Sequence, residues 1–328
     1  MARTNKNVCL YCFGDLDRHK VCMRCHRLAH DEPMVAHRLP ARFLLEGRYL
    51  IVRTLGEGGF GITYLAWDAL KCEQVAVKEY FPAGSAERAP RSAQVVYTKD
   101  SRPAANRGLS RFTDEARILA ELRNLPGIVS VRDFFSANDT AYIVMEYLDG
   151  VSLKKYVTRK GGKLPLADIL GIMRPVMESL IPVHEKGLIH RDISPDNILI
   201  TKHGEVKLID FGAAQQGSTG DKNAAVVLTQ GFAPEEQYRA RGEQGSWTDV
   251  YALGATIYFC ITGRIPPESI QRAAKDTILR PSELGVAIAS AQENALMKAL
   301  AVTRKNRYLT VRQFMNGIYR KPRAADKS

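Results

Sequence analysis

The sequence has no long uninterrupted run of apolar side chains. Its longest apolar stretch, Val250–Ile261, falls well short of the roughly 20 residues that a membrane-spanning helix needs. The first ten residues are polar and lack the apolar core of a signal peptide. We therefore expect no membrane span, no secretion and a reducing, cytoplasmic setting.

No long block of lysine and arginine occurs, although these residues are plentiful. The 328 residues include 47 Lys and Arg against 35 Asp and Glu, a net charge of +12. Such an excess suits acidic partners such as nucleotides, nucleic acid or anionic lipid, while basic residues spread over a solvated surface are the simpler interpretation. The densest basic stretch runs from Arg304 to Lys327. With 45% hydrophobic residues, the chain can bury a sizeable core.

Cysteine is scarce and unevenly placed. The isolated Cys72 and Cys260 are predicted to be ordinary buried thiols. The other four form two CxxC pairs near the N-terminus: Cys9, Cys12, Cys22 and Cys25. Each pair can place two sulfurs on one turn, and the nine-residue spacer lets two turns oppose each other around one tetrahedral Zn²⁺. The predicted zinc site is structural, because four thiolates leave no open coordination position.

Other interpretations of this cysteine-rich segment remain open. The thiols could form a redox pair or bind nothing, and His19 or His26 could substitute as ligands. About forty residues cannot build much core, so a metal would supply the folding energy. The segment could also be the main functional module, a docking head for a partner protein. Residues 1–40 show no interleaved basic and aromatic side chains, so nucleic acid is not the expected partner.

The middle of the chain alternates in a way that is typical of strands. Three successive strands are expected over 48–55, 62–70 and 74–81, with a glycine-rich turn between the first two. Residues 82–110 show little periodicity and are predicted to be a long insertion or loop. A helix is predicted over Arg111–Arg123, since Phe112, Ala116, Leu119 and Leu122 have helical spacing. Two further strands are expected over 128–135 and 141–147.

The second half of the sequence is mostly helical in pattern. Leu166–Lys186 places its apolar residues on one broad face, although Pro175 and Pro182 are expected to kink or fray that helix. Thr248–Thr262 is apolar almost all round, which predicts a buried helix. Short strands are expected at 198–200 and 206–209.

The glycine-rich segment consists of Gly56, Glu57, Gly58, Gly59, Phe60 and Gly61. Glycines let a backbone approach phosphate oxygens without a clash from Cβ. A dinucleotide-binding loop has the same glycine spacing but opens a helix. Here the loop joins two predicted strands, which is the arrangement of a kinase.

Charged residues that suit phosphoryl transfer follow in order along the chain. Lys78 lies on the third strand, where it would contact the α- and β-phosphates, and Glu115 is its natural partner. In the segment HRDISPDN, Asp192 can accept the proton of an attacking hydroxyl and Asn197 can hold Mg²⁺. Asp210, in Asp-Phe-Gly, would chelate Mg²⁺ as well. For any one Lys or Glu alone, surface solvation is the ordinary interpretation.

With these motifs and Ala233-Pro234-Glu235, the chain resembles the eukaryotic-like (Hanks-type) serine/threonine protein kinases of bacteria. With its double CxxC, the chain also resembles a bacterial subgroup of these kinases that has a zinc-ribbon-like head. The resemblance implies an α+β, two-lobed kinase fold with a β-rich N-lobe, a helical C-lobe and ATP bound in the cleft between them. The implied domains are a four-cysteine module (1–40), a linker (41–48), an N-lobe (49–145), a hinge (146–150), a C-lobe (151–319) and a basic tail (320–328).

The resemblance also implies a nucleotide site. Besides the glycine-rich segment and Lys78, the residues expected to contact ATP are Leu55, Thr63, Ala76, Met145, Glu146, Leu148, Ser152 and Leu199. Met145 occupies the gatekeeper position, the hinge backbone would bond the adenine, and Ala76 and Leu199 would pack above and below the ring. The expected ligands are ATP, Mg²⁺ and a structural Zn²⁺, and the expected partners are protein substrates.

Several positions bear on regulation and on departures from the family pattern. The family places Lys two residues after the catalytic Asp, whereas this chain has Ser194, which removes one positive charge. Ser218 and Thr219 are the expected phosphorylation sites, and Thr229 is expected to contact Asp192. Arg307 resembles the arginine that pairs with the glutamate of Ala-Pro-Glu, here Glu235.

Two other functions compete with protein phosphorylation. A pseudokinase scaffold would bind nucleotide without transfer, but it usually lacks one of the residues at positions 78, 192, 197 or 210. A small-molecule kinase is disfavoured by the intact Ala233-Pro234-Glu235 with a threonine before it.

Overall fold

A computed structural model describes residues 9–10, 14–28, 35–122, 124–211, 228–239 and 242–320. The chain divides into two compact units. The first comprises residues 1–116 and 131–147, and the second comprises residues 117–130 and 148–328. The boundary after Tyr147 falls inside the predicted hinge, and the cysteine-rich segment belongs to the first unit.

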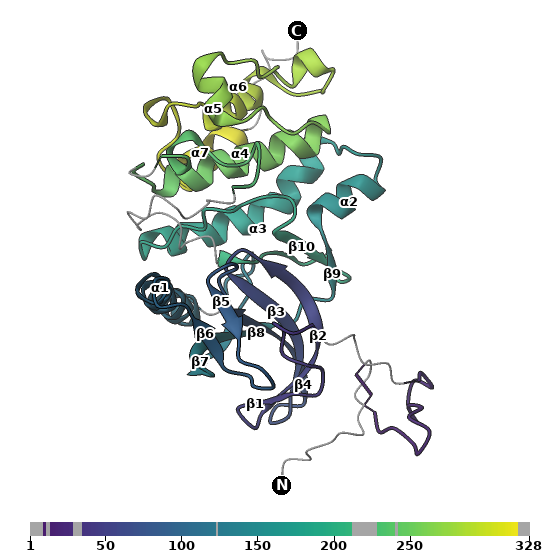
Figure 1. Ribbon diagram of the computed structural model, residues 1–328. Helices are drawn as coiled ribbons and strands as arrows, with labels where there is room; N and C mark the ends of the chain where they lie inside the picture. The colour runs from purple at the N-terminus through teal and green to yellow at the C-terminus, as the bar shows by residue number, and fades with distance from the viewer. Residues whose placement is uncertain are drawn as a thin grey trace. The chain divides into compact units, whose positions relative to one another are not determined.

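The first unit is built on a six-stranded antiparallel sheet with the order β1-β2-β3-β4-β8-β7 (Figure 1). The strands are β1 (Leu44–Leu45), β2 (Tyr49–Gly58), β3 (Gly61–Asp68), β4 (Glu73–Tyr80), β7 (Val131–Ala137) and β8 (Thr140–Glu146). These strands confirm the predicted ones. They form because their β-branched and aromatic side chains suit a pleated, buried surface.

The segment expected to be a linker, 41–48, carries strand β1. Its backbone is bonded to β2: the Arg42 N–H donates to the Ile51 carbonyl, and the Ile51 N–H donates to the Phe43 carbonyl, each at 2.8 Å. These bonds fix the segment to the edge of the sheet.

The prediction of a loop over 82–110 was wrong for much of its length. Strands β5 (Ala86–Arg88) and β6 (Val95–Tyr97) pair as a hairpin, and helix α1 (Arg102–Glu121) begins nine residues before the predicted start at Arg111. Pro103 is tolerated because the first turn of a helix needs no donor there. The helical spacing was hard to see, because of the residues from 102 to 110 only Ala105 is buried.

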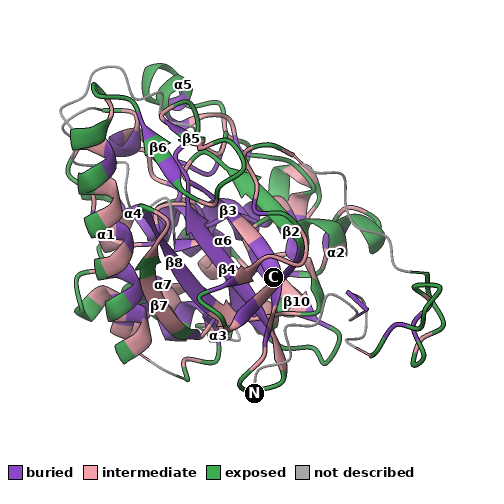
Figure 2. Cartoon of the chain, turned by 60° about the horizontal axis from the view of Figure 1, so that its bottom comes forward, coloured by how far each residue is buried: buried purple, intermediate pink, exposed green. Residues whose placement is uncertain are grey.

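The core of the first unit combines apolar strands with one buried polar cluster. Figure 2 shows β3, β4 and β8 largely buried and the outer side of α1 exposed. Behind the sheet, the Glu79 carboxylate accepts hydrogen bonds from Tyr64, Tyr142 and Arg88 at 2.6–2.9 Å. The Arg88 guanidinium also donates to the His37 and Ala93 carbonyls, so the β5–β6 hairpin is tied to β4. The hydrogen bonds to both groups offset part of the cost of burying their charges.

The second unit is mainly helical, as predicted. Its helices are α2 (Leu153–Arg159), α3 (Leu166–Glu185), α4 (Ser246–Thr262), α5 (Ser269–Ala274), α6 (Ser290–Ala299) and α7 (Val311–Ile318). Helix α3 packs against α4 and α7 and runs unbroken through Pro175 and Pro182, so the predicted fraying does not occur. Helix α4 is buried along nearly its whole length, as its apolar sequence predicted.

A small antiparallel sheet, β11-β10-β9, completes the second unit. Its strands are β9 (Gly150–Ser152), β10 (Ile198–Thr201) and β11 (Val206–Leu208), and the last two confirm the predicted pair. Among the helices in the described ranges, none combines the length and the apolar character that crossing a membrane requires.

Candidate active site

The glycine-rich turn joins β2 to β3, as predicted. A Cβ placed on Gly56, Gly58 or Gly59 would meet no atom within 4 Å, so the turn is surrounded by open space. Gly61 differs, because a Cβ there would collide with the carbonyl oxygen of Glu79 on β4. Glycine is therefore required at Gly61 by the close approach of two strands, while the other three leave room for a ligand to approach the backbone.

The predicted nucleotide residues of the first unit lie side by side on the sheet. Thr63 on β3 faces Lys78 on β4, and Ala76, two residues earlier on β4, faces Met145 on β8. Cross-strand partners share a face, so these four side chains belong to one side of the sheet. Glu146 is the partner of Val75 and therefore points to the other side.

Lys78 and Glu115 are both buried in the first unit, at 8% and 5% exposure. Glu115 lies on α1, whose position is set by Phe112, which packs against Tyr80 at the end of β4 with ring centroids 5.6 Å apart. The sequence thus brings a cation and a carboxylate into the interior of the same unit, where neither would be stable without compensating charge.

The second unit carries the remaining predicted nucleotide residues. Ser152 on β9 is the cross-strand partner of Leu199 on β10, and Leu148 lies four residues before Ser152. The Ser152 hydroxyl caps α2 by accepting the Lys155 N–H at 3.3 Å. A structural role for this side chain was not predicted.

The Asp192 carboxylate is held on both oxygens. The Thr229 hydroxyl donates to Oδ1 at 2.7 Å, which confirms the contact expected from the sequence. The Asn197 amide donates to Oδ2 and to the Asp192 carbonyl, each at 2.8 Å. Charge-assisted bonds of this kind are short and directional, so the carboxylate has one defined orientation.

The backbone before Asp192 is fixed by a buried carboxylate on α4. Asp249 accepts the His190 and Arg191 N–H groups at 2.9 and 2.8 Å, and its Oδ2 lies 2.7 Å from His184 Nε2. Burial alone would raise the pKa of Asp249, but its hydrogen bonds, led by that with His184, hold the pKa below its usual value. Asp249 therefore remains charged and keeps Arg191 in its left-handed conformation, with φ of 69°.

Two contacts tie the Asp-Phe-Gly segment to this loop. The Ile209 N–H donates to the Asn197 carbonyl at 2.8 Å, and the His190 ring contacts the Phe211 ring at a centroid distance of 4.5 Å. Complete burial lowers the pKa of His190, so this imidazole stays neutral. Asp210, between Ile209 and Phe211, is half-buried and also left-handed, with φ of 69°.

The glutamate that pairs with Arg307 is Glu236 and not Glu235 as predicted. Arg307 Nη1 lies 2.8 Å from Glu236 Oε1, and both side chains are buried. Glu235 instead pairs with Arg239 near the surface. The chain enters a 3₁₀ turn (Glu235–Gln237) after Pro234, and this turn points the second glutamate inward, where Thr248 also donates to it.

The comparison with known protein families supplies the decisive observation, since residues 49–319 match the protein kinase domain. The chain belongs to the protein kinase family. It is 34% identical over 224 residues to the serine/threonine-protein kinase PrkC of Bacillus subtilis, covering 68% of this chain and 31% of that protein. It is 31% identical over 288 residues to the serine/threonine-protein kinase PknA of Nostoc sp., covering 84% and 47%.

A solved kinase structure is also similar. The structure titled "PpkA-294 apo form" has a TM-score of 0.75 at 32% identity, covering 86% of this chain and 99% of that one. The predicted resemblance to bacterial serine/threonine kinases is therefore confirmed. This kinase spans about a third to a half of the length of the two curated relatives.

Gln237 is a further residue that orders the loop before Asp192, and it was not predicted from the sequence. Its side-chain amide donates to the Arg191 carbonyl at 2.8 Å, so it fixes the peptide that leads into Asp192. The available signal in the sequence was a glutamine immediately after a pair of glutamates. This signal does not identify the partner, because Arg191 is distant in sequence. The predicted phosphorylation sites Ser218 and Thr219 lie outside the described residues.

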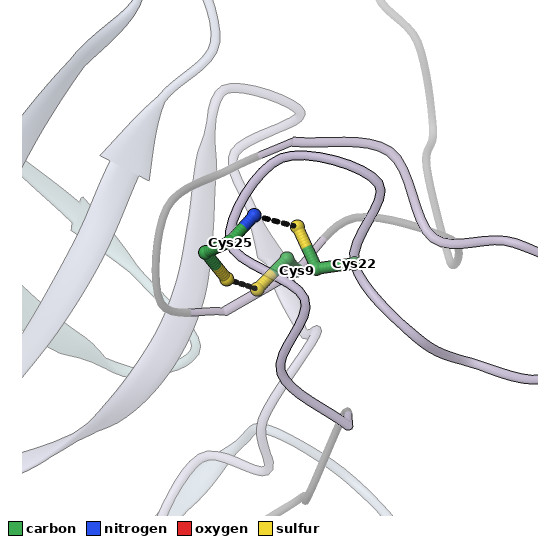
Figure 3. A group of neighbouring side chains, drawn as sticks. All are labelled: Cys9, Cys22 and Cys25. Atoms are coloured by element: carbon green, nitrogen blue, oxygen red, sulfur yellow. Dashed lines mark hydrogen bonds between the residues drawn. The ribbon is translucent and has the colours of Figure 1, made fainter.

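Three of the four N-terminal cysteines of this kinase come together. One ligand atom from each of Cys9, Cys22 and Cys25 lies within 4.8 Å of the others, and the Cys9 and Cys25 sulfurs are 3.6 Å apart (Figure 3). The Arg24 and Cys25 N–H groups point at the Cys22 sulfur at 3.3 and 3.4 Å, an arrangement that stabilises a thiolate.

The other cysteines differ from one another. The predicted ligand Cys12 lies outside the described residues. Cys260 is buried as expected, and burial raises the pKa of its thiol to about 12, whereas Cys72 is exposed, which contradicts the prediction of a buried thiol.

Proposed function

We propose that this kinase transfers the γ-phosphoryl group of Mg-ATP to serine and threonine hydroxyls of proteins, including its own. The observation that carries the proposal is the Asp192 carboxylate, oriented by Asn197 and by Thr229. The two relatives from Bacillus subtilis and Nostoc sp. are named serine/threonine-protein kinases, which supports the same acceptor residues. Protein substrates fit the presence of Thr229 four residues before Ala233, at the start of the Ala233-Pro234-Glu235 segment.

Two sets of residues would bind the nucleotide and its metal ion. Lys78, oriented by Glu115, would bind the α- and β-phosphates under the glycine-rich turn. Asn197 and Asp210 would hold Mg²⁺, which neutralises charge on the phosphate oxygens. The Asn197 side-chain amide already bonds to Asp192, and its carbonyl oxygen remains the natural metal ligand.

In the chemical step, the acceptor hydroxyl oxygen forms a bond to the γ-phosphorus while the bond from this phosphorus to the ADP oxygen breaks. The hydroxyl proton passes to the Asp192 side chain, which acts as the general base. Since Thr229 and Asn197 hold the carboxylate in one orientation, little rearrangement is needed when the acceptor arrives.

Measuring phosphate incorporation into a generic basic protein with Mg-ATP tests this function. Asp192→Asn should reduce incorporation by orders of magnitude while nucleotide binding persists, because the altered group contacts the acceptor and not the nucleotide. Asp168→Asn, an exposed position on α3, is the matched control and should leave activity unchanged. A wild-type protein that binds nucleotide and never transfers phosphate would identify a pseudokinase.

We also propose autophosphorylation at Ser218 or Thr219, the hydroxyls expected from the sequence. Mass spectrometry of the active protein should find phosphate on one of them, and Asp192→Asn protein should lack it. Full activity with both positions replaced by alanine and no phosphate in the wild type would contradict a regulatory role.

We propose finally that Cys9, Cys12, Cys22 and Cys25 bind one structural Zn²⁺. The three described thiols support this, because they converge without forming a disulfide and two backbone N–H groups point at one sulfur. Elemental analysis should give about one zinc per chain, and Cys22→Ser should lose the metal while Cys72→Ser keeps it. Metal-free native protein with a disulfide would favour redox chemistry. A docking partner at this module stays a prediction.

A further inference from the structure

The chain before strand β1 contacts the β2–β3 hairpin through Leu10 in the cysteine-rich segment and through His37 and Arg38. We propose that this N-terminal part positions the glycine-rich turn for nucleotide, with Leu10 packed against the hairpin and Arg38 bonded to its turn, so that metal binding by the cysteines controls nucleotide affinity. This inference rests on the proposed kinase function and deepens it.

The first contact is apolar. Leu10 forms a buried cluster with Val52 on β2 and Leu65 on β3, and Tyr147 packs against the same cluster. Leu65 is the cross-strand partner of Ala76, so its side chain belongs to the face of the sheet that carries the predicted nucleotide residues. Leu10 therefore supports the hairpin from the side that would face the nucleotide.

The position of Leu10 depends on the cysteine cluster. Leu10 directly follows Cys9, whose N–H donates to the Gly14 carbonyl at 2.8 Å and whose sulfur faces Cys25. A small segment with few large apolar side chains needs its metal to keep such a turn. Loss of the metal would release Cys9, and with it the neighbouring Leu10.

The second contact is ionic and reaches the turn itself. The Glu57 carboxylate bonds to His37 through Oε1 at 2.7 Å and to Arg38 through Oε2 at 3.0 Å. Desolvation alone would raise the pKa of Glu57, but the bonds from Arg38 and His37 outweigh it and lower this pKa. Both carboxylate oxygens are thus engaged by one short stretch of chain.

That stretch is itself fixed to the back of the sheet. The Leu39 N–H donates to the Tyr64 hydroxyl at 3.1 Å, and this hydroxyl donates to the buried Glu79 carboxylate. The Arg88 guanidinium holds the His37 carbonyl at 3.0 Å. The backbone on both sides of Arg38 is therefore fixed. An exposed ion pair made from a fixed backbone loses less entropy than one between two free side chains, so it is more stabilising.

The turn is the end of the β2–β3 hairpin, whose backbone pairing reaches Gly58 and Gly61. Its backbone accepts the Phe81 N–H at Phe60 and the Ala83 N–H at Gly59, and a Cβ on Gly56, Gly58 or Gly59 would meet no atom within 4 Å. A turn that is ordered before nucleotide arrives loses less entropy on binding. Removing Leu10 or Arg38 should therefore weaken nucleotide binding without touching the residues proposed for chemistry.

The experiment measures two quantities on the full chain: the affinity for Mg-ADP by calorimetry, and amide hydrogen exchange over residues 55–63. Arg38→Ala should weaken Mg-ADP binding about two- to five-fold, the effect of one partly exposed ion pair. Leu10→Ser and zinc removal should each weaken it about tenfold, since both free the apolar support. All three should speed exchange in the turn.

Two controls match these changes. Arg53→Ala removes an exposed arginine from the same hairpin, and Met23→Ser removes an exposed apolar side chain from the cysteine segment. Both should leave affinity and exchange unchanged. Unfolding by circular dichroism shows whether Leu10→Ser protein is folded, and Arg38→Ala tests the inference independently of it.

The outcomes separate this inference from the proposed function. If wild type binds Mg-ADP and the variants bind it equally well, with unchanged exchange, the inference is overturned. If wild type binds no nucleotide, the proposed function fails, and exchange over 55–63 still decides whether the N-terminal part orders the turn. A coupling between Arg38→Ala and Glu57→Gln in a double-mutant cycle would assign the effect to their ion pair.

Discussion

The glycine-rich turn and the catalytic loop are held in opposite ways. The loop from His190 to Asn197 is fixed by a buried carboxylate, Asp249, and by the Gln237 amide. The turn from Gly56 to Gly61 has open space at the Cβ positions of three glycines, and its Glu57 carboxylate pairs with His37 and Arg38 near the surface. The groups proposed for chemistry are therefore preorganised, while the groups proposed to cover phosphates can adapt.

This difference follows from what each segment has to do. A general base must be oriented before the reaction, because reorganisation during proton transfer would add to the barrier. Arg191 and Asp210 adopt left-handed conformations, which cost on the order of 1 kcal/mol each and persist only where the surroundings impose them. The turn needs no such strain, since neither Gly56, Gly58 nor Gly59 has a positive φ.

Breaking the rigid side of this comparison should give the largest effect. Asp249→Asn replaces one carboxylate oxygen with an NH₂ group, so a donor would face either the Arg191 N–H at Oδ1 or the His190 N–H and His184 at Oδ2. We expect a loss of about 2–4 kcal/mol in the free energy of unfolding and a kcat reduced more than tenfold. Urea denaturation and a kinase assay measure the two, with Asp168→Asn as the exposed control.

The contribution of Asp249 to stability should also depend on pH, in a direction that follows from its pKa. The pKa of Asp249 is lower in the folded state than in the unfolded chain, so its contribution is complete above the unfolded value of about 3.9 and is lost as pH falls through the folded value. Wild-type stability should therefore fall more steeply than that of Asp249→Asn below about pH 4. Parallel curves would show that Asp249 does not carry the charge assigned to it.

A second prediction concerns the buried ion pair between Glu236 and Arg307. Glu236→Gln leaves the buried Arg307 guanidinium without its charge partner and should cost about 3 kcal/mol. Glu235→Gln removes a pair between Arg239 and a glutamate near the surface and should cost less than about 1 kcal/mol. The reverse order in urea denaturation would restore Glu235 as the partner of Arg307.

These two glutamates show which contacts could not be predicted from the sequence. The strands, the buried helix at Thr248–Thr262 and the order of the motifs were all visible, because periodicity and short motifs are local. The choice between Glu235 and Glu236 was not visible, since it depends on a 3₁₀ turn that points the second one toward a residue 71 positions away. Gln237 was missed for the same reason.

The prediction of a loop over 82–110, after the third strand, was wrong for a different reason. Residues 102–110 expose most of their surface, so no apolar period marks the first half of α1. In the cysteine segment, the spacing of the cysteines predicts a metal site but says nothing of what Leu10 or Arg38 contact. Their partners, Val52, Leu65 and Glu57, lie within the strands and turn that the sequence did predict.

A third prediction tests the turn itself through two glycines. Gly61→Ala would force its Cβ against the Glu79 carbonyl and should lower stability by about 1–3 kcal/mol, with weaker nucleotide binding. Gly58→Ala meets no neighbouring atom and should leave stability within about 0.5 kcal/mol of wild type. Thermal unfolding and Mg-ADP calorimetry compare them. Equal losses of stability would mean that β3 and β4 do not approach as closely as described.

The smallest effect should come from the ionic attachment of the turn. Glu57 is about one third exposed, so its pair with Arg38 is screened, and Glu57→Gln should change stability by less than about 0.5 kcal/mol at neutral pH. The pKa of Glu57 is lowered by folding, so this small contribution is present above the unfolded value of about 4.3 and disappears as pH falls through the folded value. The same difference should vanish in 1 M salt, where the screening length is about 3 Å. Thermal unfolding of wild type and Glu57→Gln at neutral and acidic pH, at low and high salt, measures it. A difference that survives both acid and salt would mean that Glu57 stabilises the turn through packing, and the turn would then be held more rigidly than its open surroundings indicate.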